Sequence, residues 1–185
     1  DIRIESSNIS FVPSEFFKAY DNVKEFVAIN CSIKTIFYDT FLSAFKLHYL
    51  VLSYNNIEII PDNAFQNISD LQTLKLDNNE IEFLTTSVFR GLNMLRTLKL
   101  SFNKITYLPL FIFRDLENLE TLQLNNNRIK IISLDQFATN NQLTLIDLNS
   151  NAVTIVDNGT FDVLINIQQL NLENNVCVNR SFDHT

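Results

Sequence analysis

The feature that most constrains this chain is a unit of 24 residues that repeats in one register from end to end. In residues 95–118, apolar side chains occupy unit positions 1, 4, 6, 11, 14, 19 and 22, and Asn103 occupies position 9. Residues 71–94 repeat this pattern, and residues 119–142 depart from it only at position 22, where Asn140 stands. A unit this short cannot bury its own apolar face, so the units are expected to stack on one another.

The spacing L-x-x-L-x-L-x-x-N/C-x-L, within a period of 20–29 residues, is typical of leucine-rich repeats. We therefore predict one leucine-rich repeat domain over residues 1–185, an α/β solenoid of about eight repeats. A parallel β-sheet should line its concave face, and irregular or short 3-10 helical turns should form its convex face. The repeats are 1–22 (partial), 23–46, 47–70, 71–94, 95–118, 119–142, 143–166 and 167–185 (partial).

Individual unit positions carry distinct physical tasks. Position 9 is asparagine from the third repeat onward, and its amide can donate to and accept from buried backbone groups of the turn. Ser7 and Cys31 hold this position in the first two repeats and can satisfy fewer of these backbone groups. The N-terminal end of this ladder should therefore be weaker. Position 19 is phenylalanine in every complete window, which predicts a spine of stacked rings: Phe17, Phe41, Phe65, Phe89, Phe113, Phe137 and Phe161.

Composition and motifs exclude several classes of function. The net charge is −7, which argues against general nucleic-acid binding, since that requires a basic surface. No apolar run approaches the roughly 18 residues that would insert into a membrane. The only histidines, His48 and His184, belong to no cluster with metal-ligand spacing. We therefore expect no metal, no cofactor and no enzymatic activity.

The N-glycosylation sequons and the cysteines bear on whether the protein is secreted. Of the N-x-S/T sequons, Asn67 and Asn158 fall on the outer turns, where we expect glycans if the protein is secreted. The two cysteines, Cys31 and Cys177, lie six repeats apart, roughly 29 Å at one strand spacing per repeat, and cannot bond within one chain. Cys31 should be a buried thiol of the ladder, which leaves Cys177 as the candidate for an intermolecular disulfide.

The strand positions that face out of the concave sheet predict a partner site in repeats 2 to 5. Clustered apolar and aromatic residues mark interaction surfaces, and the two lysines stand out on an acidic chain. The alternative is that β-branched residues merely favour strands. We expect a protein partner, or a second copy of this chain, on the following residues: Val27, Ile29, Tyr49, Val51, Tyr54, Lys75, Lys99 and Phe102.

A second apolar series occupies position 13, where a free loop would be polar. Partial burial against neighbouring repeats is the favoured interpretation, and a lateral partner surface is the alternative. The series runs Phe11, Thr35, Ile59, Phe83, Tyr107, Ile131 and Ile155.

The whole chain resembles extracellular leucine-rich repeat proteins of the typical 24-residue class. Its N-x-I-x-x-I-x-x-x-x-F units, without a cysteine-rich N-terminal cap, look like those of insect secreted leucine-rich repeat proteins, mosquito immune proteins among them. The resemblance implies a haemolymph protein that helps complement-like factors to recognise pathogens, as a disulfide-linked dimer. We therefore expect a secreted, non-catalytic protein-recognition module in innate immunity or scaffolding. The alternative is a fragment of a receptor or cell-adhesion ectodomain.

Overall fold

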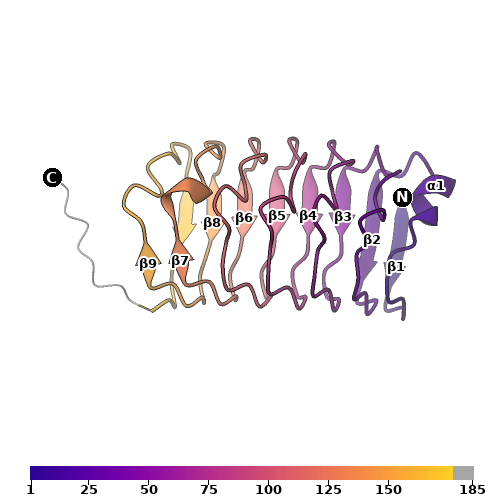
Figure 1. Ribbon diagram of the computed structural model, residues 1–185, viewed down its shortest axis with the longest axis horizontal. Helices are drawn as coiled ribbons and strands as arrows, with labels where there is room; N and C mark the ends of the chain where they lie inside the picture. Colours follow the sequence, from indigo (N-terminus) through magenta and orange to yellow (C-terminus); the bar gives the residue numbers. More distant parts are fainter. Residues whose placement is uncertain (177–185) are drawn as a thin grey trace.

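The computed structural model describes residues 1–176, and Figure 1 shows them as a row of stacked coils. One sheet of parallel strands runs through the whole row in the order β1-β2-β3-β4-β5-β6-β8-β10. A shorter sheet pairs β7 with β9. The strands are β1 Ile2–Glu5, β2 Glu25–Ile29, β3 Tyr49–Val51, β4 Thr73–Lys75, β5 Thr97–Lys99, β6 Thr121–Gln123, β7 Ile131–Ile132, β8 Leu145–Asp147, β9 Ile155–Val156 and β10 Gln169–Asn171.

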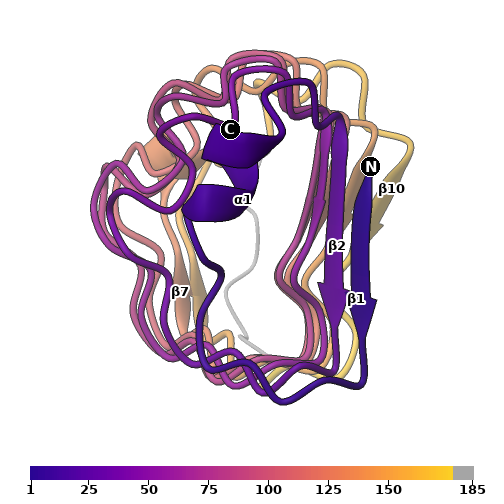
Figure 2. The same cartoon turned by 90° about the vertical axis from the view of Figure 1, so that its right-hand side faces the viewer.

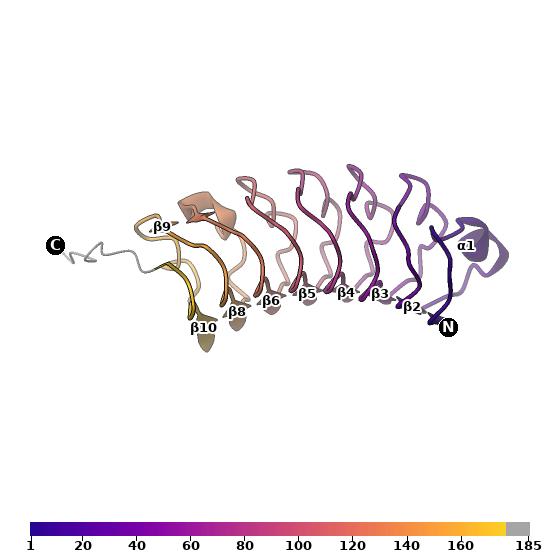
Figure 3. The same ribbon diagram turned by 90° about the horizontal axis from the view of Figure 1, so that it is seen from below.

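The stack curves, and the main sheet lines its inner side (Figure 3). Viewed along the stack, β7 lies on the side opposite β1 and β2 (Figure 2). Each strand pairs with the next at a shift of one repeat, as Leu74 does with Leu98. The predicted leucine-rich repeat solenoid, with its parallel concave sheet, is confirmed.

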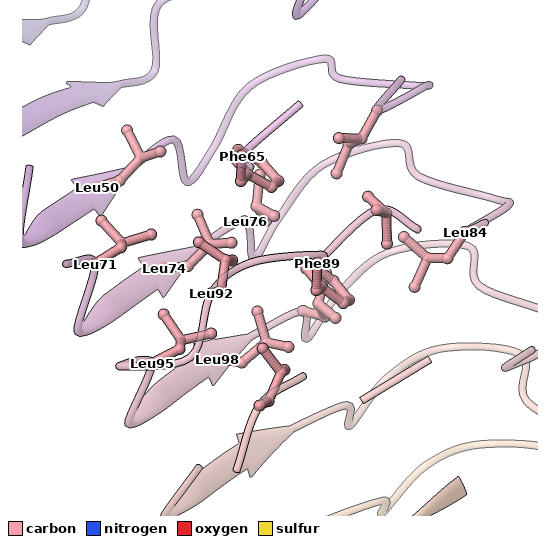
Figure 4. Packing of buried hydrophobic residues seen from close by; sticks show 14 of the residues in the cluster. Leu50, Phe65, Leu71, Leu74, Leu76, Leu84, Phe89, Leu92, Leu95 and Leu98 are labelled. Atoms are coloured by element: carbon pink, nitrogen blue, oxygen red, sulfur yellow. The ribbon is translucent and has the colours of Figure 1, made fainter. Parts of the chain in front are cut away.

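The interior between the two sides is a continuous apolar core. Leu74 and Leu98 are fully buried, and Figure 4 shows them pointing from their strands toward Phe65, Phe89 and neighbouring leucines. The expected phenylalanine spine is present. The rings of Phe113 and Phe137 stack at 5.9 Å between centroids with 5° between their planes. Phe161, at the C-terminal end of the spine, is only half-buried.

The asparagines at position 9 form the predicted ladder. The Asn103 amide donates to the carbonyl oxygens of Leu76, in the preceding repeat, and Leu100, in its own, at 3.0 Å each. Its Oδ1 accepts the backbone N–H of Ile81 at 3.0 Å. One side chain therefore satisfies buried backbone groups of two successive turns, which would otherwise be unpaired at a cost of about 1–3 kcal/mol each.

The ladder thins at the N-terminal end, as expected. Cys31 is fully buried, and its thiol reaches the carbonyl oxygens of Ile4 at 3.4 Å and Ile29 at 3.2 Å. Ser7 donates only to the carbonyl of Glu5, at 3.1 Å. A thiol is a weak donor and a hydroxyl has a single proton, so neither replaces an amide fully.

The convex turns are short and irregular. Helix α1 covers Glu15–Ala19 and the 3-10 helix η1 covers Leu134–Gln136, while the corresponding segments of the other described repeats are turns. Prolines start several of these turns, and the carbonyl of Pro109 accepts the N–H of Ile112 at 3.3 Å. The predicted mixture of irregular and 3-10 turns is therefore confirmed, with one short α-helix at the N-terminal end.

Asn140 shows how the core accepts a polar residue at position 22. Its side chain is completely buried, and its amide donates to the carbonyls of Phe113 at 2.9 Å and Leu116 at 2.8 Å. The asparagine thus adds a second, local bridge between successive repeats on the outer side of the core.

The spine should contribute strongly to stability. Phe113→Ala removes a fully buried ring between two neighbours, and we expect the free energy of unfolding to fall by about 3–5 kcal/mol. Phe161→Ala, at a half-buried ring, is the matched control and should cost clearly less. Chemical denaturation measures both, and equal losses would show that stacking within the spine is not what stabilises the solenoid.

Candidate recognition surfaces

The outward side chains of the concave sheet form rows that cross the strands. The row at position 5 passes through Val27, Val51, Lys75 and Lys99 as successive register partners. Its members change from apolar to basic and then, at Gln123 and beyond, to polar and acidic. A partner that crosses the sheet therefore meets a different chemistry in each part of the stack.

Two of the predicted apolar contacts are not accessible. Val27 is 3% exposed and Val51 is 4% exposed, and Ile29 is half-buried. The valines are short side chains in a row flanked by Arg3 and Lys75, and strands only about 4.8 Å apart let the longer side chains cover them. The expectation that Val27 and Val51 are exposed anchors is therefore wrong.

Tyr49 and Lys75 act as one unit. The Lys75 ammonium donates to the Tyr49 hydroxyl at 2.6 Å, and Nζ lies 5.0 Å from the centroid of the ring. Such a short distance to the hydroxyl makes this chiefly a hydrogen bond rather than a cation over the ring face. The bond directs the Lys75 side chain toward Tyr49 in repeat 3 and away from Lys99 in repeat 5.

Lys75 and Lys99 are direct register partners in adjacent strands. Like charges placed opposite each other destabilise a sheet. Neither lysine forms an ion pair within residues 1–176. The two lysines are therefore cationic groups without an ion pair in this part of the chain, and they suit an acidic group of a partner.

Tyr54 and Phe102 lie at the carboxyl edge of the sheet, on either side of Asn78. Tyr54 is 58% exposed and Phe102 is 52% exposed. Both adopt left-handed backbone, with φ of 57° and 55°. That conformation is uncommon for bulky residues, whereas asparagine tolerates it.

The left-handed geometry recurs at position 8 of every repeat. The residues there are Ser6, Asn30, Tyr54, Asn78, Phe102, Asn126, Ser150 and Asn174. Sequence reasoning selected the two aromatic residues for their exposure and missed their backbone. The alternation with asparagine at this position was the signal that could have revealed it.

The modification sites lie on the turns. Asn158 is exposed, and Asn67 is half-buried, with its amide 3.4 Å from the carbonyl of Leu42. Occupancy at either remains a prediction. Cys31 is a free, buried thiol. Cys177, the candidate for an intermolecular disulfide, lies outside the described residues.

No group of three or more His, Cys, Asp or Glu side chains in residues 1–176 is placed to hold a metal ion. His48 is held locally, with Nδ1 2.6 Å from the carbonyl oxygen of Lys46. Within the same residues, no helix has the length and apolar character needed to cross a bilayer.

The apolar series at position 13 is partly buried at its two ends, where Phe11, Ile131 and Ile155 are 44%, 37% and 39% exposed, as the sequence favoured, but its middle is largely exposed. Ile59 is 70% exposed and Phe83 is 67% exposed. The bridge pairs Phe11–Thr35–Ile59 and Ile131–Ile155 align the series across repeats on the side opposite the main sheet. The turns of adjacent repeats run parallel here, and the side chain at position 13 points away from the stack. We call this series the convex stripe.

The chain belongs to the leucine-rich repeat family. The family model described as leucine rich repeat matches residues 45–105, 95–153 and 117–176. These matches agree with the register read from the sequence. No curated protein matches the chain.

Solved structures share the fold. The chain is similar to TLR13 in the crystal structure of the TLR13-ssRNA13 complex, with a TM-score of 0.87 and 28% identity over 94% of this chain and 24% of that chain. It is also similar to the leucine-rich repeat protein LIC12759 of Leptospira interrogans, with a TM-score of 0.81 and 23% identity over 93% of this chain and 43% of that one. The chain thus spans less than half the length of either relative. Its family and its likeness to TLR13 support a recognition module.

The left-handed aromatic residues should reduce stability. We expect Tyr54→Asn to raise the free energy of unfolding by about 1 kcal/mol, because asparagine relieves backbone strain at a side chain that buries little. The reverse change, Asn78→Tyr, is the matched control and should lower it by at least as much. Denaturant titration measures both, and a clear loss of stability in Tyr54→Asn would mean that the ring is a structural contact.

Proposed function

We propose that the concave face of repeats 3 to 5 recognises an acidic segment of a protein partner, without catalysis. The observation that carries this proposal is the pair of exposed aromatic side chains, Tyr54 and Phe102, in left-handed backbone. They lie on the same face as Lys75 and Lys99, which form no ion pair within residues 1–176. Strained residues cluster at functional sites, because a residue chosen for stability alone would avoid the conformation. Aromatic side chains also dominate the binding energy of protein interfaces.

The two kinds of side chain have separate roles in this proposal. Tyr54 and Phe102 supply apolar contact area, while Lys75 and Lys99 attract and orient the acidic segment. Partner binding would relieve the repulsion between the two lysines. This electrostatic contribution to the binding free energy should decrease as the salt concentration rises. Proteins of the leucine-rich repeat family are typically non-catalytic recognition modules, in agreement with this role.

A secreted role in innate immunity is the form of this function that we favour. The support is the resemblance to insect secreted leucine-rich repeat proteins, together with the 28% identity to TLR13. A fragment of a receptor or adhesion ectodomain would use the same face. Mass spectrometry of protein secreted from insect cells tests the compartment, and absence of glycan at exposed Asn158 would count against it.

A nucleic-acid ligand is a second candidate. The structure of TLR13 is that of a complex with ssRNA13, and lysines beside an exposed aromatic ring suit single-stranded nucleic acid. The net charge of −7 opposes it. A binding measurement with labelled single-stranded RNA at physiological salt distinguishes a nucleic-acid ligand from a protein ligand. Binding that is lost in Lys75→Gln/Lys99→Gln would make nucleic acid the ligand.

The protein proposal predicts a specific pattern of loss. Tyr54→Asn/Phe102→Asn should weaken binding of a partner captured from the native fluid by about 2 kcal/mol, or roughly 30-fold, without lowering the melting temperature. Gln123→Ala/Asn149→Ala, on the C-terminal half of the same face, is the matched control and should have little effect. If the control variant loses partner binding and the aromatic variant keeps it, the binding site lies elsewhere on the protein.

A further inference from the structure

The central part of the convex stripe, in repeats 3 to 6, is flanked by acidic side chains in repeats 3 and 4 and by basic side chains in repeats 5 and 6. In repeats 3 and 4, positions 10 and 12 carry Glu58, Glu80 and Glu82, whereas repeat 2 has a basic residue, Lys34, at position 12. In repeats 5 and 6, the same positions carry Lys104, Arg128 and Lys130. The acidic and basic parts of the stripe meet at an ion pair between Glu80 and Lys104, in repeats 4 and 5.

The other flanking charges of repeats 3 to 6 form no ion pairs within the described residues. Among residues 1–176, Glu58 and Glu82 on one side and Arg128 and Lys130 on the other form no ion pair, and all four are exposed. The stripe between them is exposed as well, with Ile59, Phe83 and Tyr107 among its most accessible members. An apolar strip that is flanked by acidic residues over repeats 3 and 4 and by basic residues over repeats 5 and 6 is complementary to a reversed copy of itself.

The acidic part of the stripe, in repeats 3 and 4, is also hollowed. A surface hollow of about 310 Å³ is lined by Glu58, Ile59, Glu80, Glu82, Phe83 and Lys104. Its apolar side chains suit the aliphatic stem of a long basic residue, and its carboxylates suit the charged end. The basic part of the stripe offers such a residue in Lys130, next to Ile131.

We propose that the convex stripe is a self-association surface, on which a second copy of this chain docks antiparallel about a two-fold axis between repeats 4 and 5. A two-fold interface uses the same patch on both subunits. This axis sets repeat 3 of one copy against repeat 6 of the other, so that Glu58 faces Lys130 twice. Phe83 faces Tyr107 at the centre, where two convex surfaces make their closest approach.

The charges select this orientation over the parallel one. In a parallel pair, each repeat faces its own copy, and Glu58 and Glu82 lie opposite a second set of glutamates. Like charges across an interface cost affinity and exclude the wrong arrangement. The back-to-back dimer leaves both concave faces open, so it does not depend on the proposed function and would make any concave ligand bivalent.

The dimer should be weak and sensitive to salt. Convex surfaces meet over a limited area, below the roughly 800 Å² per partner of a standard interface. Sedimentation velocity of the purified chain at increasing concentration measures it. Phe83→Ser/Tyr107→Ser should raise the dissociation constant at least about tenfold, because both central contacts are lost.

The decisive variants exchange the facing charges. Glu58→Lys alone and Lys130→Glu alone should each weaken the dimer, and the double variant should recover the wild-type constant to within about threefold. Only the antiparallel arrangement predicts this recovery. Met94→Ser and Glu117→Lys change exposed side chains outside the stripe and are the matched controls.

Two results would overturn the proposal. One is a chain that stays monomeric up to about 1 mM, the weak end of specific association. The other is a dimer that tolerates Phe83→Ser/Tyr107→Ser, or that is not recovered by the charge exchange, since it would form through another face. Melting temperatures of all variants should match that of the wild type, because every substituted side chain is exposed.

Discussion

The asparagine ladder is the interaction on which the rest of the structure depends. Each ladder side chain bonds to backbone groups of its own repeat and of the one before, as Asn103 does with Leu100, Leu76 and Ile81. Because these backbone groups are buried, they need partners within the protein, and the bonds set both the spacing and the register of the repeats. A fixed register in turn decides which side chains enter the core and which face outward.

The ladder also explains where function can reside. Apolar positions and position 9 are committed to the stack, whereas positions 5, 8 and 13 are held in place by it and remain free to vary. At these positions the chain departs from what stability alone would choose: adjacent Lys75 and Lys99, left-handed Tyr54 and Phe102, and exposed Phe83. A rigid scaffold thus presents two chemically different surfaces on opposite sides.

The 24-residue period predicted the features that depend on contacts between equivalent positions of neighbouring repeats. The parallel sheet, the ladder, the buried thiol of Cys31 and the phenylalanine spine all follow from positions that recur every 24 residues. Burial of Val27 and Val51 did not follow, because it depends on the lengths of unlike side chains across the sheet. The high exposure of Ile59 and Phe83 did not follow either, since the pattern does not reveal which way a loop side chain points.

Hydrogen exchange at the Ile81 amide tests the role of the ladder most directly. This N–H donates to Asn103 Oδ1 in the next repeat, so its protection reports the ladder bond itself. If the ladder holds the stack, Asn103→Ser should lower protection at Ile81 roughly tenfold or more, and leave the amides of α1 unchanged. Unchanged protection at Ile81 would show that the apolar core alone sets the register, and would contradict this account.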